Sequence, residues 1–160
     1  MDERDLPYLS RILQDSRVMY AYNGPFSEEE TLAWLKKQQN RYLSDGFGLW
    51  GVWLKQNSEM IGQCGITWQE YENRQIPGIG YLLAYDYWHL GYASEAAVAC
   101  REYGFQSLHF DELFSIIRDS NTASQKVALL NGMKAVGKKT IHYRGVCMPH
   151  IVFRTTKTVG

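Results

Sequence analysis

The sequence predicts a mixed α/β fold in a single domain, with helices flanking a central sheet. Hydrophobic residues form 45% and aromatic residues 14% of the 160 residues, which is the composition of a chain that folds around a core. Along the chain, apolar residues change from helical spacing to strand-like runs and back again. Two strand-like segments are joined through a helical one, and such a connection predicts parallel strands within the sheet.

Two helices are predicted at the start of the chain. Apolar residues recur at helical spacing over residues 2–14, which indicates an amphipathic helix. Ser27 and Glu30 form a capping-box pair, in which each side chain accepts a hydrogen bond from the backbone N–H of the other residue. A second helix is therefore predicted over residues 28–43.

Six strands and two further helices are predicted in the remainder of the chain. The strands are segments rich in aromatic and β-branched residues: 47–54, 60–68, 76–85, 112–118, 138–143 and 149–155. An alanine-rich helix is predicted over residues 91–105 and a short one over residues 122–131. Because the helix at 91–105 connects strands 76–85 and 112–118, these two strands are predicted to be parallel.

Charge and cysteine content argue against several classes of protein. The 17 Lys and Arg residues balance the 17 Asp and Glu residues, which argues against a nucleic-acid-binding protein. The three cysteines and four histidines lack the spacing of a disulfide framework or a metal site. No segment approaches the roughly 20 apolar residues that span a membrane, and the charged start lacks a leader pattern. We expect a cytoplasmic protein, monomeric or homodimeric, without a metal and without nucleic-acid or membrane partners.

Two glycine-rich segments match nucleotide-binding motifs by letter only. Residues 46–51 fit the dinucleotide pattern G-x-G-x-x-G, but they lie between a predicted helix and a strand, which reverses the required order. Residues 132–138 spell most of a phosphate loop, but Lys139 occupies the position of its Ser or Thr. We interpret Gly46 and Gly132 as residues that end helices.

The start of the helix at 91–105 has the features of an anion site. Gly91 and Ala93 leave its entrance without bulky side chains, so free backbone N–H groups point to a place where the helix dipole favours negative charge. A pyrophosphate fits such a site, and an ordinary tight loop before a packed helix is the alternative. Asn121 and Ser124 begin the next predicted helix, where such residues usually act as caps.

Together these segments resemble the GNAT superfamily of acyl-CoA-dependent N-acetyltransferases, in the branch similar to the RimJ/RimL ribosomal-protein N-terminal acetyltransferases. The resemblance is spread over most of the chain, and its specificity lies in the order of several short motifs. In chain order these are Trp34-Leu35, Phe47-Gly48-Leu-Trp-Gly-Val52, Ile61-Gly62-Gln-Cys-Gly65, Ile79-Gly80-Tyr81, Tyr87-Trp88-His-Leu-Gly91-Tyr92-Ala93-Ser94-Glu95-Ala96, Asn121-x-x-Ser124 and Asn131-Gly132-Met133.

The resemblance implies a mixed central sheet in which two parallel strands splay apart, and acetyl-CoA as a co-substrate whose pantetheine lies in the gap. Strand residues 82–84 would pair with the pantetheine, residues 90–94 would bind the pyrophosphate, and Asn121 would contact the pantetheine. Ser124 is implied as the catalytic acid that protonates the leaving thiolate. The implied cofactor-binding residues are Leu82, Leu83, Ala84, His89, Leu90, Gly91, Tyr92, Ala93, Ser94 and Asn121.

The chain departs from the family pattern in three places. His89 and Leu90 replace the small and basic pair that often precedes Gly91, which removes one cation for the phosphates. Gly78 stands where many relatives carry a strand glutamate, a frequent candidate general base. The usual first strand has no counterpart, because the chain begins at or near the first helix; a truncated start and a real loss both explain this. Residues 1–160 are expected to form one GNAT domain.

The resemblance implies transfer of an acetyl group from acetyl-CoA to a primary amine by direct attack in a ternary complex. Strand N–H groups near Leu82 and Leu83 would bond the developing oxyanion. The family permits a small-molecule or a peptide amine as the acceptor. Two alternatives stay open: a catalytically idle acyl-CoA-binding module, suggested by the missing glutamate, and a purely structural or partner-binding domain.

The acceptor site is the part that the sequence specifies least. Aromatic residues that would line it, with core packing as the alternative, are Tyr20, Tyr22 and Phe26. Without a strand carboxylate, the amine proton is expected to leave through water, and the groups that would polarise this water are Glu70, Glu72 and Tyr143. An α-amino group, with a pKa of about 7.7–8.0, is substantially neutral at cellular pH, whereas a lysine amine, near 10.4, is not. We therefore expect a low-pKa amine such as a protein N-terminus.

Overall fold

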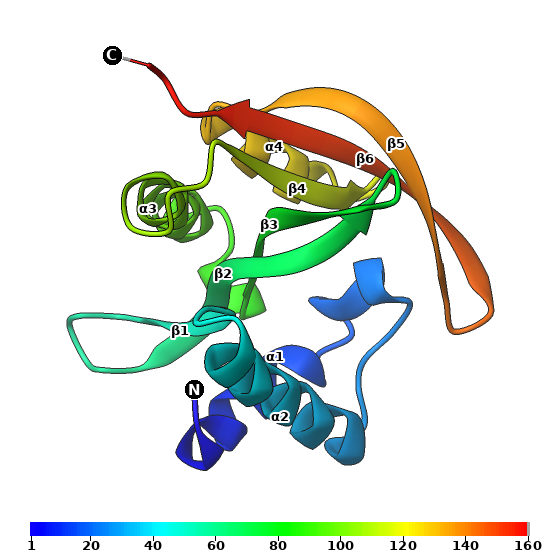
Figure 1. The fold of residues 1–160 in the computed structure, drawn as a ribbon. Helices are drawn as coiled ribbons and strands as arrows, with labels where there is room; N and C mark the ends of the chain where they lie inside the picture. The colour runs from blue at the N-terminus through cyan, green and yellow to red at the C-terminus, as the bar shows by residue number, and fades with distance from the viewer. Residues whose placement is uncertain (160) are drawn as a thin grey trace.

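Residues 1–159 are described by the computed structural model and form four α-helices, three short 3-10 helices and six strands (Figure 1). The helices are η1 (Glu3–Asp5), α1 (Leu6–Leu13), η2 (Met19–Tyr22), α2 (Glu28–Ser44), η3 (Tyr85–Tyr87), α3 (Tyr92–Gln106) and α4 (Thr122–Leu130). The strands are β1 (Leu49–Trp53), β2 (Met60–Tyr71), β3 (Arg74–Leu83), β4 (Glu112–Arg118), β5 (Lys134–Tyr143) and β6 (Val146–Thr156).

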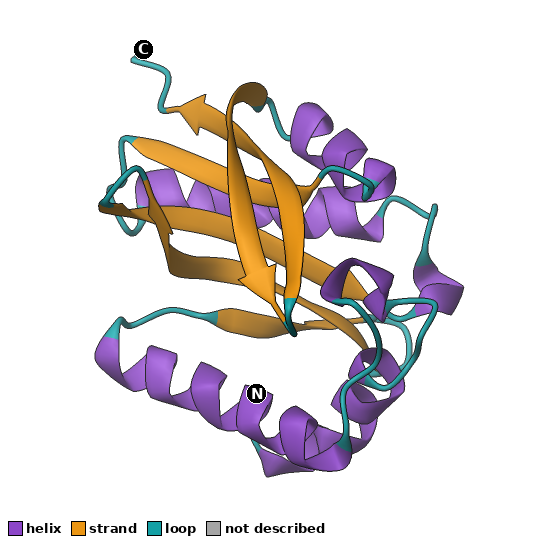
Figure 2. Cartoon of the chain, turned by 90° about the vertical axis from the view of Figure 1, so that its right-hand side faces the viewer, coloured by secondary structure: helices purple, strands orange, loops and turns teal. Residues whose placement is uncertain are grey.

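Helices cover both faces of one six-stranded sheet, whose strand order is β1-β2-β3-β4-β6-β5 (Figures 1 and 2). Side chains of β3 alternate between two buried clusters, because successive residues of a strand point to opposite faces. Ile79 and Tyr81 join the cluster under α3 and α4, and Leu82 joins the one under α1 and α2. Within this described part of the chain, no helix is long and apolar enough to cross a membrane.

The local signals at helix ends are confirmed. Ser27 and Glu30 make both hydrogen bonds of the capping box at the start of α2. Gly46 and Gly132 follow the ends of α2 and α4 with φ angles of +78° and +77°, a region that glycine adopts without strain. The predicted mixed sheet with one parallel pair of strands is confirmed as well.

Strand boundaries differ from the prediction around two hairpin turns and at the start of β5, which begins at Lys134 and not at residue 138. The β2–β3 hairpin turns at Glu72 and Asn73, with φ angles of +49° and +60°. The β5–β6 hairpin turns at Arg144 and Gly145, with φ angles of +50° and +72°. Positive φ at both central residues is the type I′ geometry, which connects strands through two residues only. Neither pair is the favoured Asn-Gly, and the polar residues beside them weaken the strand pattern. The sequence therefore predicts that β2 ends, and β6 begins, three residues farther from the turn than in the structure.

The parallel strands β3 and β4 are registered at one place only. Gly78 lies opposite Phe114, and this is the single registered pair, whereas β2 and β3 are registered from Tyr71 and Arg74 onwards along the whole of β3. Ser115 of β4 donates a hydrogen bond of 2.8 Å from its hydroxyl to the Ile79 carbonyl. Beyond this bond the described chain has no further β3–β4 pair, so the carboxyl ends of the two strands are separated.

Replacing Ser115 with Ala tests the bond at the point where the strands separate. The change leaves the buried Ile79 carbonyl without this donor, so the free energy of unfolding is expected to fall by about 1–3 kcal/mol in urea denaturation. Ser16→Ala removes an exposed hydroxyl and serves as the control, with an expected change within about 0.5 kcal/mol. Equal stability of the two variants would contradict this account of Ser115.

Candidate functional site

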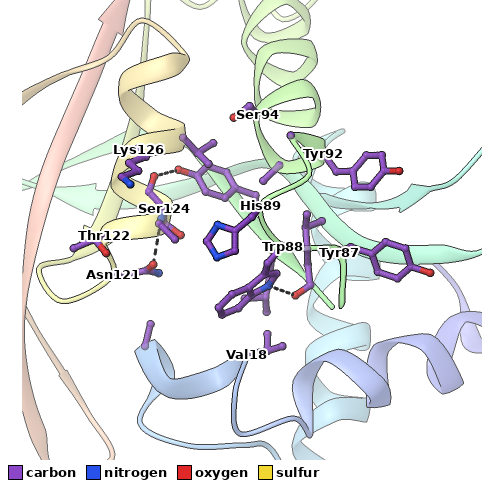
Figure 3. A pocket seen from close by; sticks show the side chains of 18 of the residues that line it. Val18, Tyr87, Trp88, His89, Tyr92, Ser94, Asn121, Thr122, Ser124 and Lys126 are labelled. Atoms are coloured by element: carbon purple, nitrogen blue, oxygen red, sulfur yellow. Dashed lines mark hydrogen bonds between the residues drawn. The ribbon is translucent and has the colours of Figure 1, made fainter. Parts of the chain in front are cut away.

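Two cavities open at the gap between β3 and β4. The first, of about 400 Å³, lies between α3, α4 and η2 and is shown in Figure 3. The second, of about 270 Å³, lies between η2, β4 and the β5–β6 hairpin. The residues that line both cavities are Ala21, Tyr81, Leu82, Asn121 and Ser124. The two cavities therefore adjoin at the separated strands.

The first cavity brings together nine of the eleven residues predicted for the site. Those nine are Leu82, Leu83, His89, Gly91, Tyr92, Ala93, Ser94, Asn121 and Ser124. Ala84 and Leu90 do not line it. The N–H of Ala84 donates to the Ile61 carbonyl of β2 at 2.8 Å, and the side chain of Leu90 is 61% exposed. The predicted loop and strand thus border this cavity, although not every residue in them faces it.

The backbone of β3 turns two N–H groups towards the gap. Ladder bonds alternate between the two sides of a strand, and Ala84 donates towards β2, so the N–H of Leu82 faces β2 as well. The N–H groups of Tyr81 and Leu83 then face the gap, beyond the last registered pair with β4. The Leu83 carbonyl accepts a hydrogen bond of 3.0 Å from Trp88 Nε1, which ties the following loop to the end of β3.

The first turn of α3 presents backbone donors to the first cavity. Gly91 is its N-cap residue, with a φ angle of +85°, and no side chain caps the helix. The N–H groups of Tyr92, Ala93 and Ser94 have no carbonyl one turn earlier to bond, and they lie at the positive end of the helix dipole. Lys126 of α4 adds a positive charge to the same lining (Figure 3). This part of the cavity is suited to an anionic group.

Hydrogen bonds tie α4 to β3 and η2 around the shared wall of the cavities. Asn121 Oδ1 accepts from the Ser124 N–H at 3.2 Å and from the Tyr20 hydroxyl at 2.9 Å. The Tyr81 hydroxyl donates to the Ser124 carbonyl at 2.5 Å, and burial raises the pKa of Tyr81, so this phenol stays protonated (Figure 3). Asn121 is therefore the cap of α4, and within the described residues the Ser124 hydroxyl makes no hydrogen bond.

The described lining of the second cavity contains no carboxylate. Its polar residues, besides the shared ones, are Tyr22, Gln69, Arg118, Tyr143 and His150. Of the three groups predicted to polarise water, Tyr143 lines this cavity, and Glu70 and Glu72 line neither cavity. Among residues 1–159, no three His, Cys, Asp or Glu side chains gather in a way that would hold a metal ion.

The three aromatic residues predicted for the acceptor site have different positions. Tyr22 lines the second cavity, and Tyr20 lines the first. Phe26 is buried in the core, where its ring packs against Tyr22 and Trp34 with centroid distances of 6.3 and 5.7 Å. Packing is therefore the role of Phe26, and the other two combine packing with a place in a cavity wall.

The imidazole ring of His150, on β6, is hydrogen-bonded through one nitrogen, which leaves the other nitrogen able to accept a proton. Its Nδ1 lies 2.7 Å from the Met148 carbonyl oxygen and donates to it, which leaves Nε2 of the neutral ring without a proton. Burial lowers the pKa of His150, and the charges of Arg118 and Lys139 lower it further. The bond to Met148 and the charge of Asp119 act in the opposite direction.

The sequence reasoning missed Arg118, Lys126 and His150 as cavity residues. Arg118 is the last residue of a correctly predicted strand, and the carboxyl ends of strands next to a gap are places where ligands bind, so this signal was available. No comparable signal in the sequence indicates that Lys126 and His150 line a cavity. Their positions depend on how α4 and the β5–β6 hairpin pack, which no local pattern determines.

Comparison with known proteins matches residues 1–134 to the acetyltransferase (GNAT) domain family. The uncharacterized protein YkkB of Bacillus subtilis (strain 168) is 38% identical over 134 residues, which cover 83% of this chain and 78% of YkkB. The structure of a GNAT-family acetyltransferase from Bacillus anthracis has a TM-score of 0.81 at 24% identity and covers 98% of this chain and 91% of that one. The structure of RimL, a ribosomal L7/L12 alpha-N-protein acetyltransferase in complex with coenzyme A, has a TM-score of 0.79 at 18% identity, with coverage of 98% and 90%.

His150 is expected to make stability depend on pH. Folding lowers the pKa of His150, so below about pH 6.5 the unfolded state binds more protons than the folded state. The free energy of unfolding therefore falls as the pH falls below about 6.5. Replacing His150 with Gln is expected to flatten the fall in free energy of unfolding between about pH 6.5 and 5, measured by urea titrations. The pKa of Asp15 is lowered from 3.8 and that of Glu30 from 4.5, so these carboxyl groups change the free energy of unfolding at more acidic pH. Identical slopes in the variant and the wild type would show that His150 has no such effect.

Proposed function

The chain belongs to the acetyltransferase (GNAT) domain family, and from this premise we propose that it transfers an acetyl group from acetyl-CoA in the first cavity to a primary amine in the second. The observation that carries the proposal is that the two cavities adjoin at the separated strands. A ternary complex needs this arrangement, because the thioester and the amine must approach one point from different directions. We propose that residues 1–160 act as one domain, in the cytoplasm, as a monomer or homodimer.

The first cavity has the donors that the two parts of acetyl-CoA require. The pantetheine arm carries amides, and the N–H of Leu83, at the end of β3 nearer α3, would bond one of them as an added strand does. The phosphates would bind the first turn of α3, at the N–H groups from Tyr92 onwards. Lys126 lies in the same lining and would supply the cation that the loop before Gly91 lacks.

The proposed reaction is direct attack of a neutral amine nitrogen on the thioester carbonyl carbon. The carbonyl oxygen becomes negatively charged, and the Tyr81 N–H, which faces the gap nearer the point where the strands separate, is the proposed donor to it. As the carbon–sulfur bond breaks, the CoA thiolate takes a proton from the Ser124 hydroxyl. The proton that the amine loses returns through water to Ser124, so the products are the amide and free CoA thiol.

The amine has to lose its proton without a carboxylate in the cavity lining. Gly78 supplies none, and a Cβ there would lie 2.8 Å from Gln69 Nε2, so a larger residue would require the Gln69 side chain to move. Tyr143 and the free Nε2 of His150 are the groups in the second cavity that can pass the proton to water. An α-amino group needs the least help, because its pKa is about 7.7–8.0. We therefore favour a protein N-terminal amine as the acceptor. RimL is named as an alpha-N-protein acetyltransferase, and the sequence motifs resemble the RimJ/RimL-like branch of this family of amine acetyltransferases.

The same lack of a carboxylate favours one alternative, an acyl-CoA-binding module without turnover. The two functions differ in one measurable product. Release of CoA thiol from acetyl-CoA in the presence of a panel of primary amines would show the transferase, and binding of acetyl-CoA without release for any amine would show the module.

Acetyl-CoA is expected to stabilise the protein through the loop at Gly91. A ligand at 100 times its Kd adds about 2.7 kcal/mol, which raises the Tm of a chain of this size by about 5–10 °C. Gly91→Val is expected to abolish this rise, because φ at this position is +85° and the loop must change.

Gly46→Val is a matched control for this measurement. Gly46 also has a left-handed φ, +78°, and open space around it, but it lies at the end of α2 and lines neither cavity. The control is expected to lower the starting Tm and keep the acetyl-CoA rise. A wild-type protein whose Tm does not respond to millimolar acetyl-CoA would refute the cofactor assignment.

Ser124 and Asn121 offer a pair of variants that separates catalysis from capping. Asn121→Ala removes the cap of α4 and is expected to cost about 1 kcal/mol of stability. Ser124→Ala leaves that cap in place and is expected to keep the wild-type free energy of unfolding while kcat falls by about 10²-fold. If Ser124→Ala turns over at the wild-type rate, Ser124 is not the acid.

A further inference from the structure

The second cavity holds a positive charge and no acidic group, and we propose that it binds an α-amino acid unit with an apolar side chain, whose carboxylate or amide carbonyl bonds to Arg118. The unit is either a free amino acid or the first residue of a peptide, since both carry a primary amine on the carbon next to a carbonyl group. This inference rests on the proposed acetyl transfer and names the acceptor class of the same site.

Arg118 is the one permanently charged residue in the described lining of the second cavity. It forms no ion pair within residues 1–159, where the other ion pairs involve Arg4, Arg11, Arg17, Arg74, Arg144 and Arg154. A guanidinium without a counter-charge favours a carboxylate or a carbonyl oxygen as its ligand. The charge in the cavity therefore selects an acceptor that carries such an oxygen.

The position of Arg118 leaves donors free for this ligand. Its Nη1 donates to the Tyr20 carbonyl at 3.0 Å, which fixes the guanidinium between the end of β4 and η2. The neighbouring η2 residues Ala21 and Tyr22 line the same cavity, so the guanidinium stands in its wall. A guanidinium has five N–H donors, and this bond uses one of them.

Much of the remaining cavity wall is apolar or aromatic. Ile117 and Met148 are buried, and Ile141 and the rings of Tyr22 and Tyr143 lie in the same lining. Burial, with a smaller effect of Tyr143, raises the pKa of Tyr22, so its phenol adds no negative charge. These side chains are complementary to an apolar or aromatic side chain of the acceptor. The polar side chains in the same lining, Gln69, Asn121, Ser124 and His150, include no carboxylate to pair with an ammonium group.

The same charge helps to keep the attacking amine neutral. An ammonium near Arg118 is repelled, and the described cavity lining has no carboxylate that would pair with it, so the pKa of the bound amine is expected to fall. A carbonyl group next to the amine lowers its pKa already in solution, to about 7.7–8.0 compared with 10.4 for a lysine amine. A polyamine brings a second positive charge into the cavity and is disfavoured by the same repulsion. One arginine thus favours both the carbonyl group and the neutral amine beside it.

A series of acceptors with one common side chain tests the proposal. The series consists of phenylalanine, phenylalanine amide, the tripeptide Phe-Ala-Ala, and phenethylamine, which lacks the carbonyl group; spermidine represents polycations. The measurement is kcat/KM for CoA-thiol release at saturating acetyl-CoA. At least one of the three carbonyl-bearing acceptors is expected to exceed phenethylamine by about tenfold or more, with spermidine slowest. The ratio of phenylalanine to Phe-Ala-Ala tells whether the free amino acid or the peptide is preferred.

Arg118→Gln separates recognition by Arg118 from the intrinsic reactivity of the amines. It is expected to reduce the preference for the best carbonyl-bearing acceptor over phenethylamine by at least about fivefold, with little change in KM for acetyl-CoA, because Arg118 does not line the first cavity. Arg4→Gln is the control, since it also removes one arginine but lies in an exposed ion pair with Asp2, and it is expected to keep the wild-type preference.

Each result decides for or against one of the two proposals. An unchanged preference in Arg118→Gln, or spermidine turnover as fast as that of the carbonyl-bearing acceptors, would overturn the inference while acetyl transfer stands. Absence of CoA release with every amine would instead contradict the proposed function. In that case binding of N-acetylphenylalanine amide, measured as a Tm shift, still tests the cavity: a shift in the wild type and none in Arg118→Gln supports it, and any other pattern contradicts it.

Discussion

A single registered pair, Gly78 opposite Phe114, joins the parallel strands β3 and β4, and the geometry of the site follows from this constraint. A longer ladder would use the N–H groups of Tyr81 and Leu83 and fill the gap where both cavities adjoin. The hydroxyl of Ser115 bonds to β3 at the point of separation, so the strands are held together on one side of that point and open on the other. The gap is therefore present in the sheet without any ligand.

Polar groups around the gap are bonded in a way that keeps its walls in place. Buried or half-buried polar groups need partners, and here Tyr81 bonds the Ser124 carbonyl while Tyr20 bonds Asn121. These bonds connect β3, η2 and α4, three elements that are far apart in the sequence. Of these residues, Tyr81, Asn121 and Ser124 line both cavities, so the bonds hold in place the wall that the two cavities share.

Local chemistry made the fold and half of the site predictable from the sequence. The capping box at Ser27, the helix entrance at Gly91 and the helix that connects β3 to β4 each depend on neighbouring residues, and the structure has all three. The direction of single residues depends on the ladder instead, which is why Ala84 bonds to β2 and does not line the cavity. The residues that line the second cavity, His150 among them, come from η2, β2, β3, β4, α4, β5 and β6 or the residues that cap them. Their proximity depends on tertiary packing, which no short motif encodes.

The central claim is that acetyl-CoA binds along β3 in the gap that the strands leave open. Hydrogen exchange of single amides by NMR, with and without acetyl-CoA, tests it most directly, because neighbouring residues of β3 should respond differently. The account predicts slower exchange of the Tyr81 and Leu83 amides on binding, and little change for Leu82 and Ala84, whose N–H groups already face β2. Equal protection of all four amides, or protection confined to a site away from β3, would contradict it.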